Sequence, residues 1–140
     1  MEWRFYIQEA TTLFTRFAKK HGLIYEVEVD APIEVLWTFP AQDGLSMPVT
    51  LGLQNGDELN FGVSDFWSYF FPFERVAADF ESYLDAWVEG NARIAITGRS
   101  SRLLQVREGH GWKTVYGAGG CLFPFRKSPR GFVQNEAPSA

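Results

Sequence analysis

The sequence predicts a single α+β domain in which an antiparallel sheet carries two helices on one face. The first observation behind this fold class is that two stretches repeat their apolar residues every three or four positions, as the buried face of a helix does. The second is that the stretches between and after them alternate apolar and polar residues, as half-buried strands do. The predicted order of elements is α-β-β-β-β-α-β-β-β, which is typical of an α+β domain.

The first helix is predicted from about Trp3 to Lys20. Its apolar residues lie on one face, and the basic residues at its end oppose the negative end of the helix dipole. Gly22 supplies the left-handed residue that commonly caps a helix. The predicted buried face consists of Trp3, Tyr6, Ala10, Leu13, Phe14, Phe17 and Ala18.

Residues 25–39 predict a hairpin of two antiparallel strands around a proline-containing turn. With a three-residue loop, Tyr25 lies opposite Trp37, and the apolar residues of both strands share one face. The other face then carries Glu28 opposite Glu34. We therefore expect an acidic strip on the outer face of this hairpin.

Residues 49–63 predict a second hairpin around an Asn-Gly pair. Asn-Gly favours a two-residue turn, but that register would mix apolar and polar residues on each face. A three-residue loop over 54–56 instead places Leu51 opposite Leu59 and keeps the apolar residues together. A slip of one residue would expose the whole apolar set of a strand to water, so the three-residue loop is the prediction.

The second helix is predicted from about Phe73 to Glu89, with Trp87 on its buried face and Gly90 as its cap. Acidic residues recur every four positions on another face of this helix. Like charges at that spacing repel one another. We expect these acidic side chains to be solvated.

The most aromatic stretch of the chain lies directly before this helix, at residues 66–73. It can fill the core between a strand and the second helix, or it can form one wall of a ligand or partner site, since ring-lined concavities bind small molecules. The residues of one segment cannot all point the same way, so we expect a core role with some rings exposed. The candidate surface residues are Phe66, Trp67, Tyr69 and Phe70.

Residues 93–117 predict three short strands that complete the sheet. In the expected register, Arg93 lies opposite Arg107, and Arg107 lies opposite Lys113. These three cations form a basic strip, which is the candidate partner-binding site. The opposite, core-facing side of the strands is expected to consist of Ile94, Ile96, Leu104, Val106, Trp112 and Tyr116.

Adjacent cations without counter-charge destabilise a sheet, so something should compensate the basic strip. Solvent and salt, carboxylates of the same chain, the acids of a partner protein and phosphates are the alternatives. Residues 1–90 hold 15 acidic and 5 basic residues, whereas residues 91–140 hold 2 acidic and 8 basic ones. The net charge of −4 and the pI of about 5.2 oppose the approach of nucleic acid. We therefore expect a protein partner.

The sequence holds no recognisable catalytic or metal-binding constellation, so we expect no catalytic residue, no metal and no cofactor. Zinc needs four Cys, His or carboxylate ligands, usually with a close pair, and His21, His110 and Cys121 do not provide this spacing. His110 is expected in a turn. The glycine-rich run 117–120 leads into a proline-containing stretch and not into a helix, which argues against a phosphate-binding loop.

These observations favour a non-catalytic interaction domain that binds another protein or a second copy of itself. The alternative is a small-molecule-binding or enzymatic domain, with an aromatic-lined pocket between sheet and helices near 66–73 and His110. The domain is expected over 1–130, followed by a flexible tail over 131–140. A single cysteine and the lack of a secretory signal or a long apolar run lead us to expect a cytoplasmic protein without a membrane partner.

Overall fold

A computed structural model describes residues 2–118 and 128–136 of the chain. The two helices are α1 (Glu2–His21) and α2 (Phe73–Val88). The first five strands are β1 (Glu26–Val27), β2 (Val35–Phe39), β3 (Val49–Gln54), β4 (Glu58–Val63) and β5 (Phe66–Trp67). The last four are β6 (Ala92–Ile96), β7 (Arg102–Glu108), β8 (Gly111–Ala118) and β9 (Gly131–Val133).

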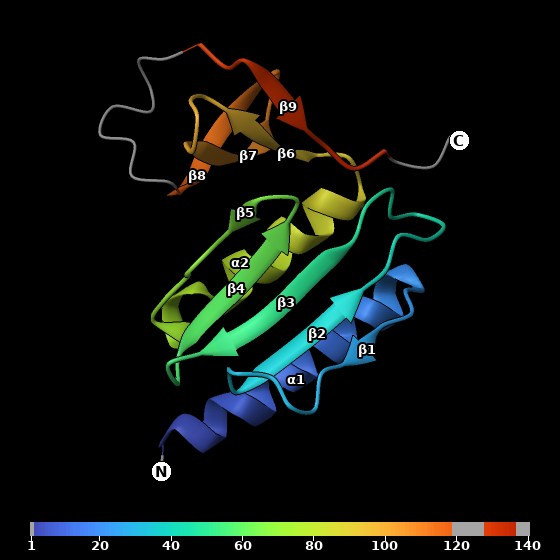
Figure 1. The fold of residues 1–140 in the computed structure, drawn as a ribbon, viewed down its shortest axis with the longest axis vertical. Helices are drawn as coiled ribbons and strands as arrows, with labels where there is room; N and C mark the ends of the chain where they lie inside the picture. The colour runs from blue at the N-terminus through green and yellow to red at the C-terminus, as the bar shows by residue number, and fades with distance from the viewer. Residues whose placement is uncertain (1, 119–127, 137–140) are drawn as a thin grey trace.

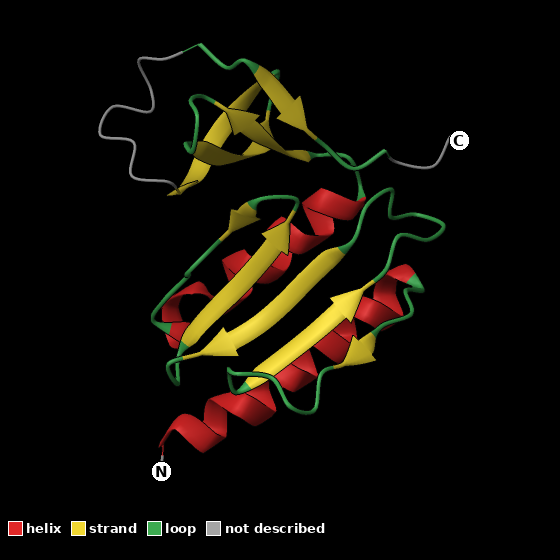
Figure 2. Cartoon of the chain, viewed as in Figure 1, coloured by secondary structure: helices red, strands yellow, loops and turns green. Residues whose placement is uncertain are grey.

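The fold is the α+β arrangement of antiparallel strands and two helices that the sequence predicts (Figures 1 and 2). The strands form two sheets: a larger one in the order β1-β2-β3-β4-β5 and a smaller one in the order β8-β7-β6-β9. The sequence predicts one sheet, whereas the structure has two. The edge of β4, where the later strands were expected to pair, is occupied by β5 and by a bridge between Leu59 and Phe70. Neither helix in the described part of the chain combines the length and apolar character needed to cross a membrane.

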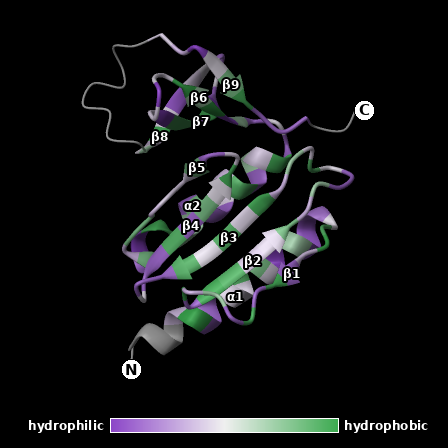
Figure 3. Cartoon of the chain, in the orientation of Figure 1, coloured by the Kyte–Doolittle hydropathy of each residue, from purple (hydrophilic) through white to green (hydrophobic). Residues whose placement is uncertain are grey.

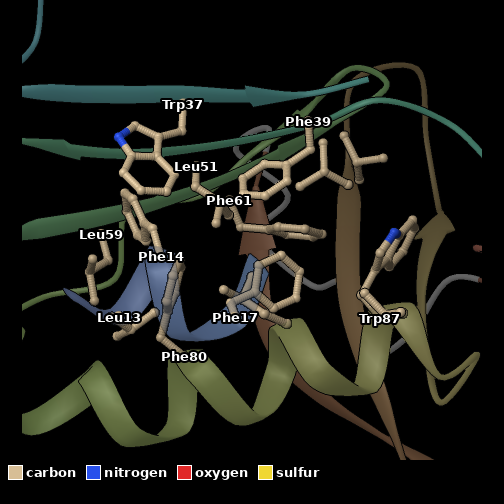
Figure 4. Close-up of a cluster of buried hydrophobic side chains, with 14 of the residues drawn as sticks. Leu13, Phe14, Phe17, Trp37, Phe39, Leu51, Leu59, Phe61, Phe80 and Trp87 are labelled. Carbon is tan, nitrogen blue, oxygen red and sulfur yellow. The ribbon is translucent and has the colours of Figure 1, made fainter. Parts of the chain in front are cut away.

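The core lies between the two helices and one face of the larger sheet, and the rings in it come from all three (Figure 4). Phe14 of α1 meets Trp37 of β2 edge to face, with ring centroids 5.6 Å apart. Phe61 of β4 meets Trp87 of α2 in the same way at 5.5 Å. Along β3 and β4, hydrophobic residues alternate with more polar ones, as one buried face requires (Figure 3).

The loop between β3 and β4 has three residues, as predicted, but it covers 55–57, one residue later than expected. Its first two residues have positive φ angles of 53° and 83°, which Asn and Gly tolerate well. Leu51 consequently lies opposite Phe61 instead of Leu59. The predicted faces are nevertheless correct, because a shift of two positions leaves every side chain on its side of the sheet.

The hairpin of β1 and β2 differs from the prediction in the same manner. Val27, and not Tyr25, lies opposite Trp37, so the connection is longer than three residues. The Tyr25 ring still stacks on the indole of Trp37, with centroids 4.2 Å apart. Glu34 does not lie opposite Glu28; its Oε1 instead accepts a hydrogen bond from a backbone N–H of the β3–β4 loop at 3.2 Å.

Residues 131–136 belong to the fold, although the sequence suggested a flexible tail from 131 onward. β9 pairs with β6, and the amide of Asn135 lies buried beyond it. Its Oδ1 accepts the N–H of Ser46 at 2.7 Å, and its Nδ2 donates to the carbonyl of Val88 at 3.0 Å. A three-residue strand is too short for its periodicity to be recognised, which is why the sequence missed it.

The two sheets are joined through Tyr116 of β8. Its ring meets Phe66 and Phe70, with centroids 5.8 and 4.8 Å away. Its hydroxyl accepts the backbone N–H of Tyr69 at 2.9 Å. Burial raises the pKa of this phenol above its usual value, although the hydrogen bond acts in the opposite direction.

Candidate functional site

The predicted basic strip is only partly assembled, because β8 contains a bulge. Leu104 lies opposite Tyr116, whereas the next residue of β7, Gln105, lies opposite Thr114, which leaves Val115 as an extra residue. An extra residue reverses which side chains face outward in the rest of the strand. Trp112 therefore moves from the predicted core face to the outer face of the smaller sheet.

The same reversal removes Lys113 from the strip. Lys113 lies opposite Val106, on the core-facing side of the sheet, and its Nζ is 3.9 Å from a carboxylate oxygen of Glu108. Arg93 and Arg107 stay on the outer face, but they are not opposite each other. Arg93 lies opposite Gln105, and Arg107 lies opposite Trp112.

Four side chains of this outer face stack in series, and we call them the cation–aromatic ladder: Phe132, Arg93, Trp112 and Arg107. The guanidinium carbon of Arg93 lies 3.9 Å from the ring centre of Phe132 and 4.2 Å from that of Trp112. The guanidinium carbon of Arg107 lies 4.5 Å from the ring of Trp112. Each member comes from a different strand, so the ladder spans the smaller sheet from β9 to β8.

Amide side chains hold both guanidinium groups through hydrogen bonds to their Nε atoms. The Nε of Arg93 donates to Oε1 of Gln105 at 2.8 Å, and Gln105 in turn donates to the hydroxyl of Thr114 at 3.2 Å. The Nε of Arg107 donates to Oδ1 of Asn91 at 3.3 Å. Among the described residues, the terminal Nη groups of both arginines form no hydrogen bond. Each guanidinium is thus held at one edge and left open at the other.

The charge of the ladder is not neutralised by the described part of the chain. No described carboxylate forms an ion pair with Arg93 or Arg107. Burial lowers the pKa of Arg93, and the charge of Arg107 lowers it further. Two cations held side by side in this way favour the binding of an anion, which would offset their repulsion.

The basic residues of α1 present the opposite situation. Arg16 forms a two-hydrogen-bond ion pair with Glu81 of α2, and Lys20 and His21 both contact Asp85 at 2.7 Å. Burial opposes ionisation of Asp85, but these hydrogen bonds lower its pKa below the usual value. Two of the acidic residues expected to be solvated, Glu81 and Asp85, therefore join the two helices.

The aromatic segment before α2 alternates between the core and the surface. Phe66 and Phe70 are buried, whereas Trp67 is half-buried and Tyr69 and Phe71 are exposed. Both roles that the sequence left open are thus present, at alternate positions. Phe66 and Phe70 are not accessible to a partner.

A groove of about 440 Å³ lies beside this segment, on the larger sheet. Its lining comes from β3, β4 and β5 and the turn between the last two, and includes Thr50, Ser64, Asp65 and Trp67. The sequence suggested a pocket between sheet and helices near His110, but no helix residue and no His110 contributes to this groove. The carboxylate of Asp65 is already paired, at 2.7 Å, with a guanidinium nitrogen of Arg102.

No metal centre is found among residues 2–118 and 128–136, where no three His, Cys, Asp or Glu side chains gather closely enough to hold an ion. His110 is exposed in the turn between β7 and β8. Cys121 and half of the glycine-rich run 117–120 lie outside the described residues. The expectation that the protein binds no zinc or iron stays a prediction.

Two members of the ladder were not identified from the sequence. Trp112 was assigned to the core because the bulge in β8 leaves no trace in the apolar pattern, and Phe132 was assigned to the tail. The apolar pair Phe132-Val133 directly after a glycine was the available signal for a short strand.

The ladder has the chemistry of a binding surface. Arginine and aromatic residues are enriched where proteins meet, and an open guanidinium edge can donate two parallel hydrogen bonds to a carboxylate. Its rings add apolar contact area, since Phe132 is 47% exposed and Trp112 is half-buried. Comparison of the chain with protein-family models, with curated proteins and with solved structures gives no match.

Proposed function

We propose that this protein is a non-catalytic interaction domain that binds an acidic, extended segment of a protein through the cation–aromatic ladder. The observation that carries the proposal is the pair of guanidiniums, Arg93 and Arg107, which are fixed on rings and lack an ionic partner among the described side chains. We place this activity in the cytoplasm, which suits a chain with one cysteine.

An extended segment suits the spacing of the ladder. Side chains two positions apart in a strand point to the same side and are about 6.5–7 Å apart. Both guanidiniums touch the same indole, so carboxylates at such a spacing can meet one arginine each. The side chain between two such acids points to the opposite side of the strand, so the acids make the contact with the ladder.

Fluorescence anisotropy with short labelled peptides tests this function. A peptide of alternating Glu and Val should bind, and the same peptide with Gln in place of Glu should bind at least about tenfold more weakly, since charge-assisted hydrogen bonds contribute about 1.5–3 kcal/mol each. Arg107→Gln should weaken binding of the acidic peptide to a similar extent.

Lys113→Gln is the matched control, because it removes one positive charge from the same sheet but on the other face. Equal binding of the Glu and Gln peptides would overturn the proposal. Wild-type affinity of the Arg107→Gln protein would do the same.

The groove beside Trp67 favours a second candidate function, the binding of a small molecule. Its half-buried indole lies against Gly62 and donates from Nε1 to Gln54 at 3.3 Å, so one ring face is held in place beside the hydroxyls of Thr50 and Ser64. A ligand of this groove should change the fluorescence of Trp67 and raise the unfolding temperature, and both effects should disappear in Trp67→Leu. Arg107→Gln should leave them unchanged.

A further inference from the structure

We infer that the partner is a second copy of this chain, and that the segment bound on the ladder is residues 26–30 of that copy. This inference rests on the proposed function of the ladder and names its partner. It would make the protein a self-associating domain, in which each copy offers one ladder and one acidic segment.

Residues 26–30 have the composition that the ladder requires. Glu26, Glu28 and Asp30 alternate with Val27 and Val29, and all five residues are exposed. The valines are exposed to 52% and 88%, which is high for β-branched apolar side chains. Among the described residues, none of the three acids forms an ion pair.

The backbone of this segment is also open. Within the described residues, β1 pairs with β2 alone and over two residues only, so its other edge carries unpaired N–H and C=O groups. Proteins usually protect such edges with charges or cover them, because they readily pair with another chain. Here the acidic side chains of residues 26–30 disfavour pairing with neutral or acidic chains, and they favour a partner that is positively charged.

The acidic segment and the ladder complement each other in the sign of their charge. The three acids of the segment lie two positions apart, so an extended strand presents them on one side, where they can face the two guanidiniums of the ladder. Within one molecule the two surfaces lie apart, because β1 is the edge strand of the larger sheet away from β5, whereas the ladder lies on the smaller sheet (Figure 1). The complementary surfaces therefore meet between copies.

Two such contacts related by a two-fold axis give a closed dimer, in which each copy binds the acidic segment of the other. Most of its charge pairs are exposed, so each contributes little, and salt screens them. The dimer should consequently weaken as the salt concentration rises. Sedimentation velocity at several protein concentrations, at low and at high salt, measures this directly.

A charge-swap experiment identifies the surfaces. Arg107→Glu and Glu28→Lys each place like charges in contact, and each protein alone should dimerise at least about tenfold more weakly than the wild type. In an equimolar mixture, each variant can still bind the other through one wild-type contact and one reversed contact. Mixing should therefore restore dimerisation, which is weakened in each variant alone. Lys113→Glu and Asp43→Lys, which change the charge equally elsewhere, should dimerise as the wild type does.

A wild-type protein that stays monomeric at high concentration and low salt would overturn this inference, and so would a dimer that is unaffected by both reversals. The second result would place the interface elsewhere, such as at the exposed rings Tyr69 and Phe71. The peptide assay separates this failure from that of the proposed function. A monomer that still binds the acidic peptide through Arg107 keeps the function and loses the partner, whereas a monomer that binds no acidic peptide loses both. Circular dichroism confirms that each variant is folded.

Discussion

The positive charges of the helical layer and of the smaller sheet have different neighbours. Arg16 and Lys20 of α1 each have a carboxylate of α2 within 2.7 Å, so their charges are used inside the molecule. Arg93 and Arg107 have amide and ring neighbours but no described carboxylate. The comparison teaches that basic residues alone do not indicate a binding surface. Fixed cations without a described counter-charge are what make the smaller sheet the candidate surface.

Replacing the ring at the centre of the helical layer should have the largest effect. Trp87 is 1% exposed and packs edge to face against Phe61. Trp87→Ala should lower the free energy of unfolding by about 3–5 kcal/mol, because a large buried ring leaves a cavity. Phe132→Ala removes a half-exposed ring of the ladder and should cost less than about 1.5 kcal/mol. Urea denaturation of both variants measures the contrast, and similar losses would contradict it.

The attachment of the chain end should have the next largest effect. Asn135→Ala removes hydrogen bonds to Ser46 and to the carbonyl of Val88, and it leaves the buried carbonyl without this partner. We expect a loss of about 1–3 kcal/mol in the free energy of unfolding. Asp43→Ala, at an exposed turn, serves as the comparison in the same denaturation experiment. A loss no greater than that of the turn variant would mean that residues after β9 do not contribute to the fold.

Acid should weaken the contact between the helices and leave the ladder unaffected. The pKa of Asp85 is lowered in the folded protein, so its ion pairs stabilise the fold above the unfolded pKa of about 3.9, and this contribution is lost as pH falls through the folded pKa. The contribution is about 1 kcal/mol or less, since the pair is partly exposed. Asp85→Asn should therefore flatten the decline of stability between about pH 5 and 2. An unchanged pH profile relative to Asp43→Asn would argue against these ion pairs.

The smallest changes in the free energy of unfolding are expected when Arg16 of the helical layer or Arg107 of the ladder is replaced. Arg16→Gln loses an exposed ion pair and should destabilise the protein by about 0.5 kcal/mol. Arg107→Gln removes a cation that repels Arg93, so the free energy of unfolding should stay unchanged or rise by a similar amount. Thermal denaturation at low salt is suited to this measurement. If Arg107→Gln destabilises the protein more than Arg16→Gln does, the ladder is a structural feature and not an unsatisfied site.

The sequence predicted which side of a strand each residue faces more reliably than which residue it meets. Leu51 was assigned to the correct face with the wrong partner, since a two-residue shift conserves the apolar pattern. The bulge at Val115 is different, because one extra residue reverses the remainder of the strand and changes no local pattern. That single irregularity moved Trp112 to the outer face and Lys113 away from it.

The candidate site was predictable in its charges and not in its rings. Arg93 and Arg107 were recognised as cations that need compensation, and both lie on the predicted face. The ladder also requires Phe132, which reaches Arg93 from a strand that pairs with a part of the chain far away in sequence. Local periodicity carries no information about such a pairing.

The return of the chain in β9 links the cation–aromatic ladder to the fold at the same few residues. Phe132 supplies the outermost ring of the ladder, and three positions later Asn135 closes hydrogen bonds at the end of α2. A protease that cuts at the exposed Arg130 would release both residues at once. Cleavage there would detach the outermost ring of the ladder and the hydrogen bonds at the end of α2 in one irreversible event.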